Sequence, residues 1–78
     1  MNWQDHIVSD KGILLGKPTI KGTRITVELI LELLGSGWTE QMILESYPHL
    51  TTVDLKSVYL FLVDCMQNEL VFPISKSA

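Results

Sequence analysis

The stretch "GKPTIKGTRITVELI", residues 16–30, contains the change of pattern that decides the fold. Its first half is rich in glycine, proline and β-branched residues, which favour turns and short extended segments. Its second half becomes an apolar run that is typical of a helix. The change occurs at Thr26, whose hydroxyl can accept a hydrogen bond from an amide of the first helical turn. We therefore predict a turn-rich segment that positions a helix beginning at Val27.

Three segments before this helix favour short strands or extended structure: "HIVSD" at residues 6–10, "GILL" at 12–15 and "PTIKGTRITV" at 18–27. They are rich in Ile, Val, Leu and Thr, and glycines separate them. Pro18 has no amide donor, so it fits an edge strand or a turn better than a central strand. Gly22 is expected in a turn that requires a positive φ.

Two further helices are predicted after the first. The first helix ends near Leu34, before the "GSG" of residues 35–37, because glycine adopts the left-handed cap conformation at little cost. Thr39 caps a short second helix, which "YPHL" at residues 47–50 breaks. A third helix is expected over residues 53–68, after a threonine cap and with an aspartate in its first turn. This spacing predicts a mainly α, tri-helical helix-turn-helix bundle with short N-terminal β-strands or a hairpin, as one domain over residues 1–74 with a disordered tail at 75–78.

Apolar residues are more abundant in two regions than a single buried helix face requires. In the first helix only Glu28 and Glu32 are polar, so it must be buried on more than one side. In the third helix a broad apolar face is predicted to pack inward, namely Leu55, Val58, Tyr59, Leu62, Val63, Cys65 and Met66. The opposite face is expected to carry Asp54, Lys56, Ser57, Asp64, Gln67 and Asn68, with apolar Val53, Leu60 and Phe61 among them. We predict a protein interface formed by Val53, Leu60, Phe61, Leu70, Val71, Phe72 and Ile74.

Charge is distributed unevenly, although the net charge of −3 does not suggest a protein held to nucleic acid by bulk electrostatics. Residues 11–24 hold four cations and no acid, and the rest of the chain is acidic. This segment could contact phosphates, pair with a second subunit, or be a chance cluster of solvated side chains. Arg24 could instead form an ion pair with Glu28 or Asp54. The candidate nucleic-acid contacts are Lys17, Lys21, Arg24 and Lys56.

The sequence contains no clear pattern for nucleotide binding, metal binding or catalysis. A phosphate-binding loop fails because Gly12 precedes Gly16 by four residues and Pro18 stands where a Ser or Thr would meet magnesium. His6, His49 and Cys65 do not form a metal-ligand pattern, and no nucleophile is paired with a base. We expect no enzyme activity, no metal, no cofactor and no small-molecule substrate. A single cysteine, no signal pattern and no apolar run of membrane-spanning length favour a cytoplasmic protein with no membrane partner.

The order of residue types over residues 7–63 resembles the sequence pattern of the small prokaryotic family known as domain of unknown function 433. The resemblance is carried by the glycine, lysine and proline of "GKP", the "GTRI" segment, the leucine-rich helix, the glycine break and the turn "YPHLT" into the last helix. The matching positions are Gly16, Pro18, Gly22, Thr23, Arg24, Ile25, Val27, Gly37, Tyr47, Pro48, Leu50 and Thr51.

The resemblance implies a homeodomain-like helix-turn-helix, often dimeric, that acts as an antitoxin beside a PIN-like ribonuclease toxin and can repress its own operon. We therefore expect a homodimer that binds and neutralises such a toxin. One alternative is a DNA-binding transcriptional regulator on an operator. For that role the start of the last helix offers a single lysine, Lys56, against Asp54. Another alternative is a structural homodimer with an unrelated protein partner.

Overall fold

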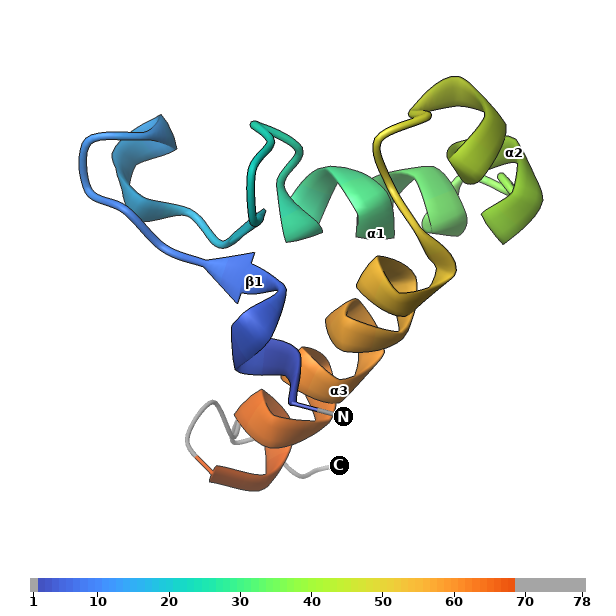
Figure 1. The fold of residues 1–78 in the computed structure, drawn as a ribbon. Coiled ribbons are helices and arrows are strands. Elements are labelled where there is room, and N and C mark those ends of the chain that lie inside the picture. Colours follow the sequence, from blue (N-terminus) through green and yellow to red (C-terminus); the bar gives the residue numbers. More distant parts are fainter. Residues whose placement is uncertain (1, 69–78) are drawn as a thin grey trace.

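The computed structural model describes residues 2–68 (Figure 1). Its element order is η1 (Trp3–Asp5), β1 (Ile7–Val8), η2 (Leu14–Gly16), β2 (Thr19–Ile20), α1 (Val27–Gly35), α2 (Glu40–Ser46) and α3 (Thr52–Asn68). The prediction of a mainly α, tri-helical fold with a short N-terminal hairpin is confirmed. The predicted interface residues Leu70, Val71, Phe72 and Ile74, and the predicted tail at 75–78, lie outside the described residues. Within residues 2–68, no helix combines the length and the apolar character needed to cross a bilayer.

The N-terminal hairpin anchors the start of α1. β1 and β2 pair antiparallel, with Ile7 opposite Ile20, and both isoleucines are buried. The Val27 amide donates to Pro18 O at 3.0 Å, and the Ile20 amide donates to Ile25 O at 2.9 Å. Between them Gly22 has a φ of 82°, which confirms the predicted turn with a positive φ. The segment at residues 16–30 is therefore the structural lead into α1, as the pattern predicted.

The predicted extended structure of "GILL" is wrong, because these residues enter a left-handed turn. Leu14, Leu15 and Gly16 have φ angles of 51°, 59° and 81°. A left-handed backbone costs a residue with a Cβ roughly 1–2 kcal/mol. Hydrogen bonds around the turn hold it in this form: the Gly16 amide donates to Ile13 O at 3.0 Å, and the Ser9 hydroxyl donates to Gly16 O. Residue preferences favour extended leucines, so this turn was not visible in the pattern.

The first helix begins and ends as predicted. The Thr26 hydroxyl accepts from the Leu29 amide at 2.9 Å. At the other end Gly37 has a φ of 101°, the Trp38 amide donates to Leu33 O and the Gly37 amide donates to Leu34 O. These two bonds form a Schellman cap, which satisfies carbonyls that the helix itself leaves unpaired. Every apolar side chain of α1 is at least partly buried, so the prediction of burial on more than one side is confirmed.

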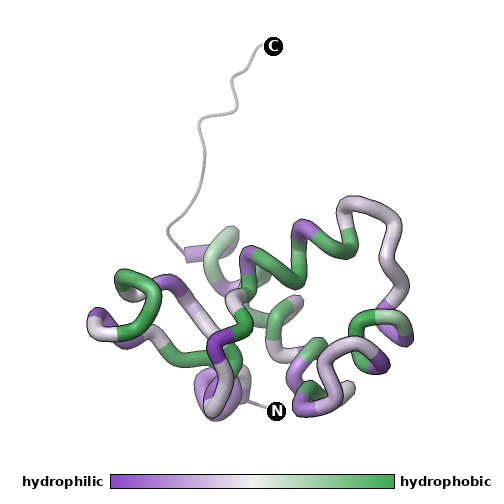
Figure 2. The backbone as a smooth tube through the Cα atoms, turned by 90° about the horizontal axis from the view of Figure 1, so that it is seen from above, coloured by the Kyte–Doolittle hydropathy of each residue, from purple (hydrophilic) through white to green (hydrophobic). Residues whose placement is uncertain are grey.

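One hydrophobic core joins the hairpin to the helices. In α2 the side chain of Thr39 accepts from the Met42 amide at 3.1 Å, and Ile43 points into the core. Figure 2 shows hydrophobic stretches along α1 and α3, which lie across each other. The buried apolar residues are Ile7, Ile20, Val27, Ile30, Ile43, Leu50, Leu55 and Val58.

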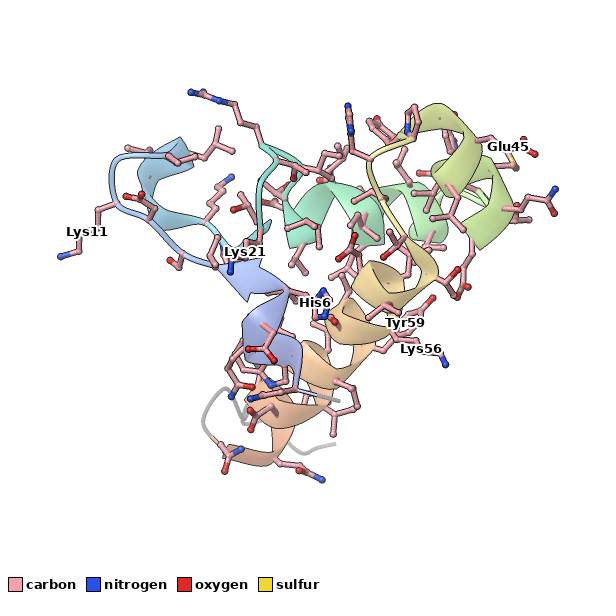
Figure 3. All side chains as sticks on the ribbon, viewed as in Figure 1. His6, Lys11, Lys21, Glu45, Lys56 and Tyr59 are labelled. Atoms are coloured by element: carbon pink, nitrogen blue, oxygen red, sulfur yellow. The ribbon has the colours of Figure 1, made fainter. Side chains whose placement is uncertain are left out.

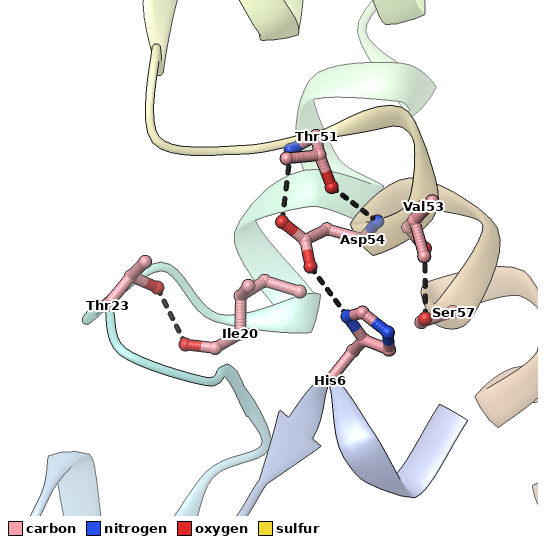
Figure 4. A network of polar contacts seen from close by, with 7 residues as sticks. All are labelled: His6, Ile20, Thr23, Thr51, Val53, Asp54 and Ser57. Atoms are coloured by element: carbon pink, nitrogen blue, oxygen red, sulfur yellow. Dashed lines mark hydrogen bonds and ion pairs between the residues drawn. The ribbon is translucent and has the colours of Figure 1, made fainter. Parts of the chain in front are cut away.

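A buried carboxylate fixes the start of α3 against the N-terminal segment (Figure 4). Asp54 is 9% exposed, and its Oδ2 accepts from the Thr51 amide at 3.0 Å. In return the Thr51 hydroxyl accepts from the Asp54 amide at 3.1 Å, which completes a reciprocal cap. His6 Nδ1 lies 3.1 Å from Asp54 Oδ1. Since an ionised carboxylate only accepts, His6 donates this bond.

Further along α3 the N-terminal segment makes a second set of contacts. The Trp3 Nε1–H donates to Asp64 Oδ2 at 3.0 Å. The rings of Trp3 and Phe61 meet edge to face, with centroids 4.9 Å apart. Residues that are far apart in the sequence are thus bound along one side of α3.

The predicted inward face of α3 is only partly right. Leu55 and Val58 are buried and Leu62 and Cys65 are partly buried, as predicted. Asp54 and Ser57, expected on the polar face, are buried, whereas Tyr59, Val63 and Met66, expected inside, are exposed. The physical reason is that Asp54 has internal partners in His6 and Thr51, and Ser57 donates to Val53 O at 2.9 Å. Polar groups that are satisfied in this way can be buried at modest cost.

Replacing Asp54 by alanine should destabilise the protein by about 2–3 kcal/mol, because the Thr51 amide and the His6 ring both lose their acceptor. Urea unfolding at equilibrium measures this change. The matched control is Gln67→Ala, an exposed position of the same helix, for which we expect a change within about 0.5 kcal/mol. A loss below about 0.5 kcal/mol for Asp54→Ala would contradict the role given to this carboxylate.

Candidate protein-interaction surface on the third helix

Five exposed apolar side chains lie along the solvent side of α3. Their exposed fractions are 42% for Val53, 39% for Tyr59, 40% for Leu60, 48% for Val63 and 64% for Met66. At about 100° per residue these positions fall within one broad sector, with Lys56 and Gln67 between them. We call this set the outer face of α3. A group of exposed apolar side chains on one side of a helix is typical of a helix that packs against another protein surface.

The exposure predicted for Val53 and Leu60 is confirmed. Phe61 differs, because it is half-buried against Trp3 on the inner side of α3. Sequence reasoning missed Tyr59, Val63 and Met66, since an apolar stripe was assigned to the core. The i, i+4, i+7 spacing of Tyr59, Val63 and Met66 was the available signal, but spacing alone does not say which of two stripes faces inward.

Tyr59 is held on the outer face by a hydrogen bond to α2. Its hydroxyl donates to Glu40 Oε2 at 2.6 Å. This bond, followed by partial burial and by the negative charge of Glu40, raises the pKa of Tyr59 above its usual value of 10.0. The ring therefore bridges α2 and α3, and its apolar edge remains available to a partner. Figure 3 shows Tyr59 beside Lys56 on this side of the molecule.

A separate groove lies between α1 and α3. Its volume is about 470 Å³. The apolar lining comes from Pro18, Val27, Leu31, Phe61 and Leu62, and the acidic residues Glu28 and Glu32 also line it. Phe61 thus belongs to the groove and not to the outer face.

The candidate nucleic-acid contacts do not form one surface. Lys17 Nζ lies 3.0 Å from Glu28 Oε1 in an exposed ion pair. Lys21 directly follows β2 and lies beside β1, whereas Lys56 lies on α3, with His6 between them in the view of Figure 3. Because phosphate contacts must follow one backbone path, this arrangement gives weak support to a single DNA-binding face.

The suggested ion pair of Arg24 with Glu28 or Asp54 is not formed. Glu28 is paired with Lys17, and Asp54 is bonded to His6 and Thr51. Among the described residues Arg24 makes no ion pair, and its exposed side chain borders a shallow hollow with Ile13 and Thr23.

Metal-binding chemistry has no obvious place in the part of the chain that the structure describes. There, no group of three His, Cys, Asp or Glu side chains is arranged to hold a metal ion. Cys65 is partly buried on α3. The surfaces with a distinct character are therefore the outer face of α3, the groove and the basic hairpin.

Comparison with known families supports the resemblance seen in the sequence. The family model described as "Protein of unknown function (DUF433)" matches residues 7–61. The chain belongs to this family. The matched DUF433 region covers the hairpin, α1, α2 and the first part of α3, and so includes Val53, Tyr59 and Leu60. Neither the curated proteins nor the solved structures gave a match to this DUF433 chain.

Replacing Glu40 by glutamine should lower the pKa of Tyr59 toward its usual value, because the neutral amide accepts the phenol hydrogen bond less strongly than the carboxylate does. With Glu40 present, the folded state favours the protonated phenol. This contribution to stability holds below pH 10.0 and is lost as the pH rises through the raised pKa of Tyr59. Carbon NMR of labelled tyrosine rings separates Tyr59 from Tyr47. An identical titration midpoint for Tyr59 in both proteins would contradict the bond to Glu40.

Proposed function

We propose that this DUF433 protein is an antitoxin-type interaction protein that binds and neutralises a PIN-like ribonuclease toxin. The observation that carries the proposal is the apolar outer face of α3, where Leu60 and Val63 are exposed at the centre. The antitoxin role itself follows from the family resemblance described above. The proposal includes a cytoplasmic location, a homodimer and repression of its own operon, with no catalytic step.

The character of the outer face favours a protein partner over DNA. Base readout in the major groove uses Arg, Lys, Asn or Gln near the start of the recognition helix. At the start of α3 Asp54 is buried and capped, which leaves Lys56 as the exposed cation of the first turns. Further along, the exposed residues are Tyr59, Leu60 and Val63. Apolar and aromatic side chains of this kind supply binding energy when another protein covers them.

Replacing Leu60 and Val63 together by serine should weaken toxin binding at least tenfold, because central apolar contacts of an interface each contribute about 1–2 kcal/mol. Since both side chains are exposed, the free protein should remain folded with nearly unchanged stability. The measurement is co-purification with the PIN-like product of an adjacent gene, followed by titration calorimetry.

The matched control for this experiment is Val8→Ser, which removes an apolar side chain of similar exposure that lies on β1 and is not part of the outer face of α3. We expect it to bind the toxin normally. Equal binding by the wild type and by the Leu60→Ser, Val63→Ser protein would remove the outer face of α3 from the interface. Failure of the wild type to bind the adjacent gene product would argue against the antitoxin role.

A DNA-binding regulator is the second candidate, and the exposed Arg24, which has no acidic partner among the described residues, favours it. If Lys21 and Arg24 contact phosphates, replacing both by glutamate should abolish a gel shift of promoter DNA at low salt, because phosphate contacts dominate such binding. Binding that is unchanged by the two replacements, or no shift by the wild type, would exclude this role for the hairpin.

A further inference from the structure

We propose that the leucine turn of one copy docks into the groove between α1 and α3 of a second copy. The leucine turn is the loop of residues 11–16, with Leu14 and Leu15 at its tip. This contact would join two copies of the chain through surfaces other than the outer face of α3. It rests on the homodimer of the proposed function and deepens it, because it assigns self-association and toxin binding to separate sites.

The leucine turn presents apolar side chains that its own chain does not cover. Leu15 is 93% exposed, and Leu14 is also exposed. Figure 2 shows this hydrophobic loop projecting to one side of the molecule, away from the helices. The left-handed backbone at both leucines is unfavourable for residues with a Cβ, and such strain tends to persist at functional sites.

Hydrogen bonds within the loop stabilise the conformation of the leucine turn. The Ser9 hydroxyl donates to Gly16 O, and Asp10 Oδ1 accepts from the Gly12 amide at 2.8 Å. The Gly16 amide closes the turn on Ile13 O at 3.0 Å. A preformed loop loses little conformational freedom when it binds, which favours a docking role over a passive connection.

The groove offers a matching receptor. Val27, Leu31, Phe61 and Leu62 give it an apolar lining, and its volume of about 470 Å³ lies within the usual range for sites that take apolar groups. The side-chain carboxylate of Glu32, at this groove, makes no hydrogen bond or ion pair among the described residues. An apolar groove beside the carboxylate of Glu32 would therefore suit an apolar segment that also carries a positive charge.

The leucine turn carries such cations. Lys11 packs beside Gly16, so that a Cβ at Gly16 would lie 3.8 Å from Lys11 Cα. Arg24 borders the hollow that Ile13 also lines. The turn is thus apolar with a basic edge, and the groove is apolar with an acidic edge. Opposite charges on two surfaces of one chain favour contact between copies, and we assign Lys11 of one copy to Glu32 of the other.

The position of the leucine turn in the fold also favours a second copy of the chain as the occupant of the groove. Figure 1 shows the leucine turn at the far end of the hairpin from α1 and α3, so the turn is directed away from its own groove. Each copy carries both the turn and the groove, and a two-fold arrangement would form both contacts at once. An anionic membrane would also attract an apolar, basic loop, but it would leave the acid-edged groove without a role.

The first test replaces Leu15 by asparagine in the full chain and measures self-association by sedimentation equilibrium. We expect the dimer to dissociate at least tenfold more readily, because the exposed apolar contact is lost. At a concentration where both proteins are monomeric, the variant should be at least as thermally stable as the wild type, since asparagine accepts a left-handed backbone more easily than leucine. The matched control is Val63→Ser, which should leave self-association unchanged.

The second test exchanges the charges. Lys11→Glu and Glu32→Lys should each weaken the dimer, and the double variant should recover most of the lost association. Glu45→Lys, on α2, should have no effect. A wild type that is monomeric at all concentrations, unchanged association in Leu15→Asn, or no recovery in the double variant would overturn the proposal. So would binding of the wild type to anionic phospholipid vesicles that Leu15→Asn abolishes without changing self-association.

Discussion

The buried carboxylate of Asp54 is the constraint on which the arrangement of α3 depends. It closes the first turn of α3 through Thr51 and accepts a hydrogen bond from His6 of the N-terminal segment. A carboxylate so placed cannot turn toward solvent without leaving two donors unpaired. The rotation of α3 about its own axis is therefore set by this polar contact together with the burial of Leu55 and Val58.

This rotation of α3 produces its outer face, which we assign to the partner protein. With Asp54 and Ser57 inside, the remaining apolar positions of α3 divide between the core and solvent. Leu55 and Val58 belong to the core cluster that also contains Ile7 and Ile30, whereas Leu60 and Val63 are exposed. The N-terminal segment supports the inner side through Trp3, which bonds to Asp64 and contacts Phe61. The hairpin is held in this core through Ile7 and Ile20, and the loop between β1 and β2 presents the leucine turn.

Much of the fold could be predicted because local chemistry decides it. Thr26, Thr39 and Gly37 cap helices in the way their side chains or backbone freedom allow, and Gly22 takes its positive φ. The left-handed leucines and the orientation of α3 could not be predicted, since both depend on partners distant in the sequence. In the candidate site the exposure of Leu60 was predicted, but that of Tyr59, Val63 and Met66 was not. The sequence pattern shows two apolar stripes on α3 and does not show the bond from His6 that selects between them.

The most direct test of the central claim is the thiol-labelling rate of a cysteine placed on the outer face, measured for Leu60→Cys in a Cys65→Ser background. We expect rapid labelling in the free protein, because Leu60 is exposed. We expect at least tenfold slower labelling once the PIN-like product of the adjacent gene is bound. Slow labelling in the free protein would show that α3 turns this position inward. Equal rates with and without the bound partner would show that the outer face of α3 is not the docking surface.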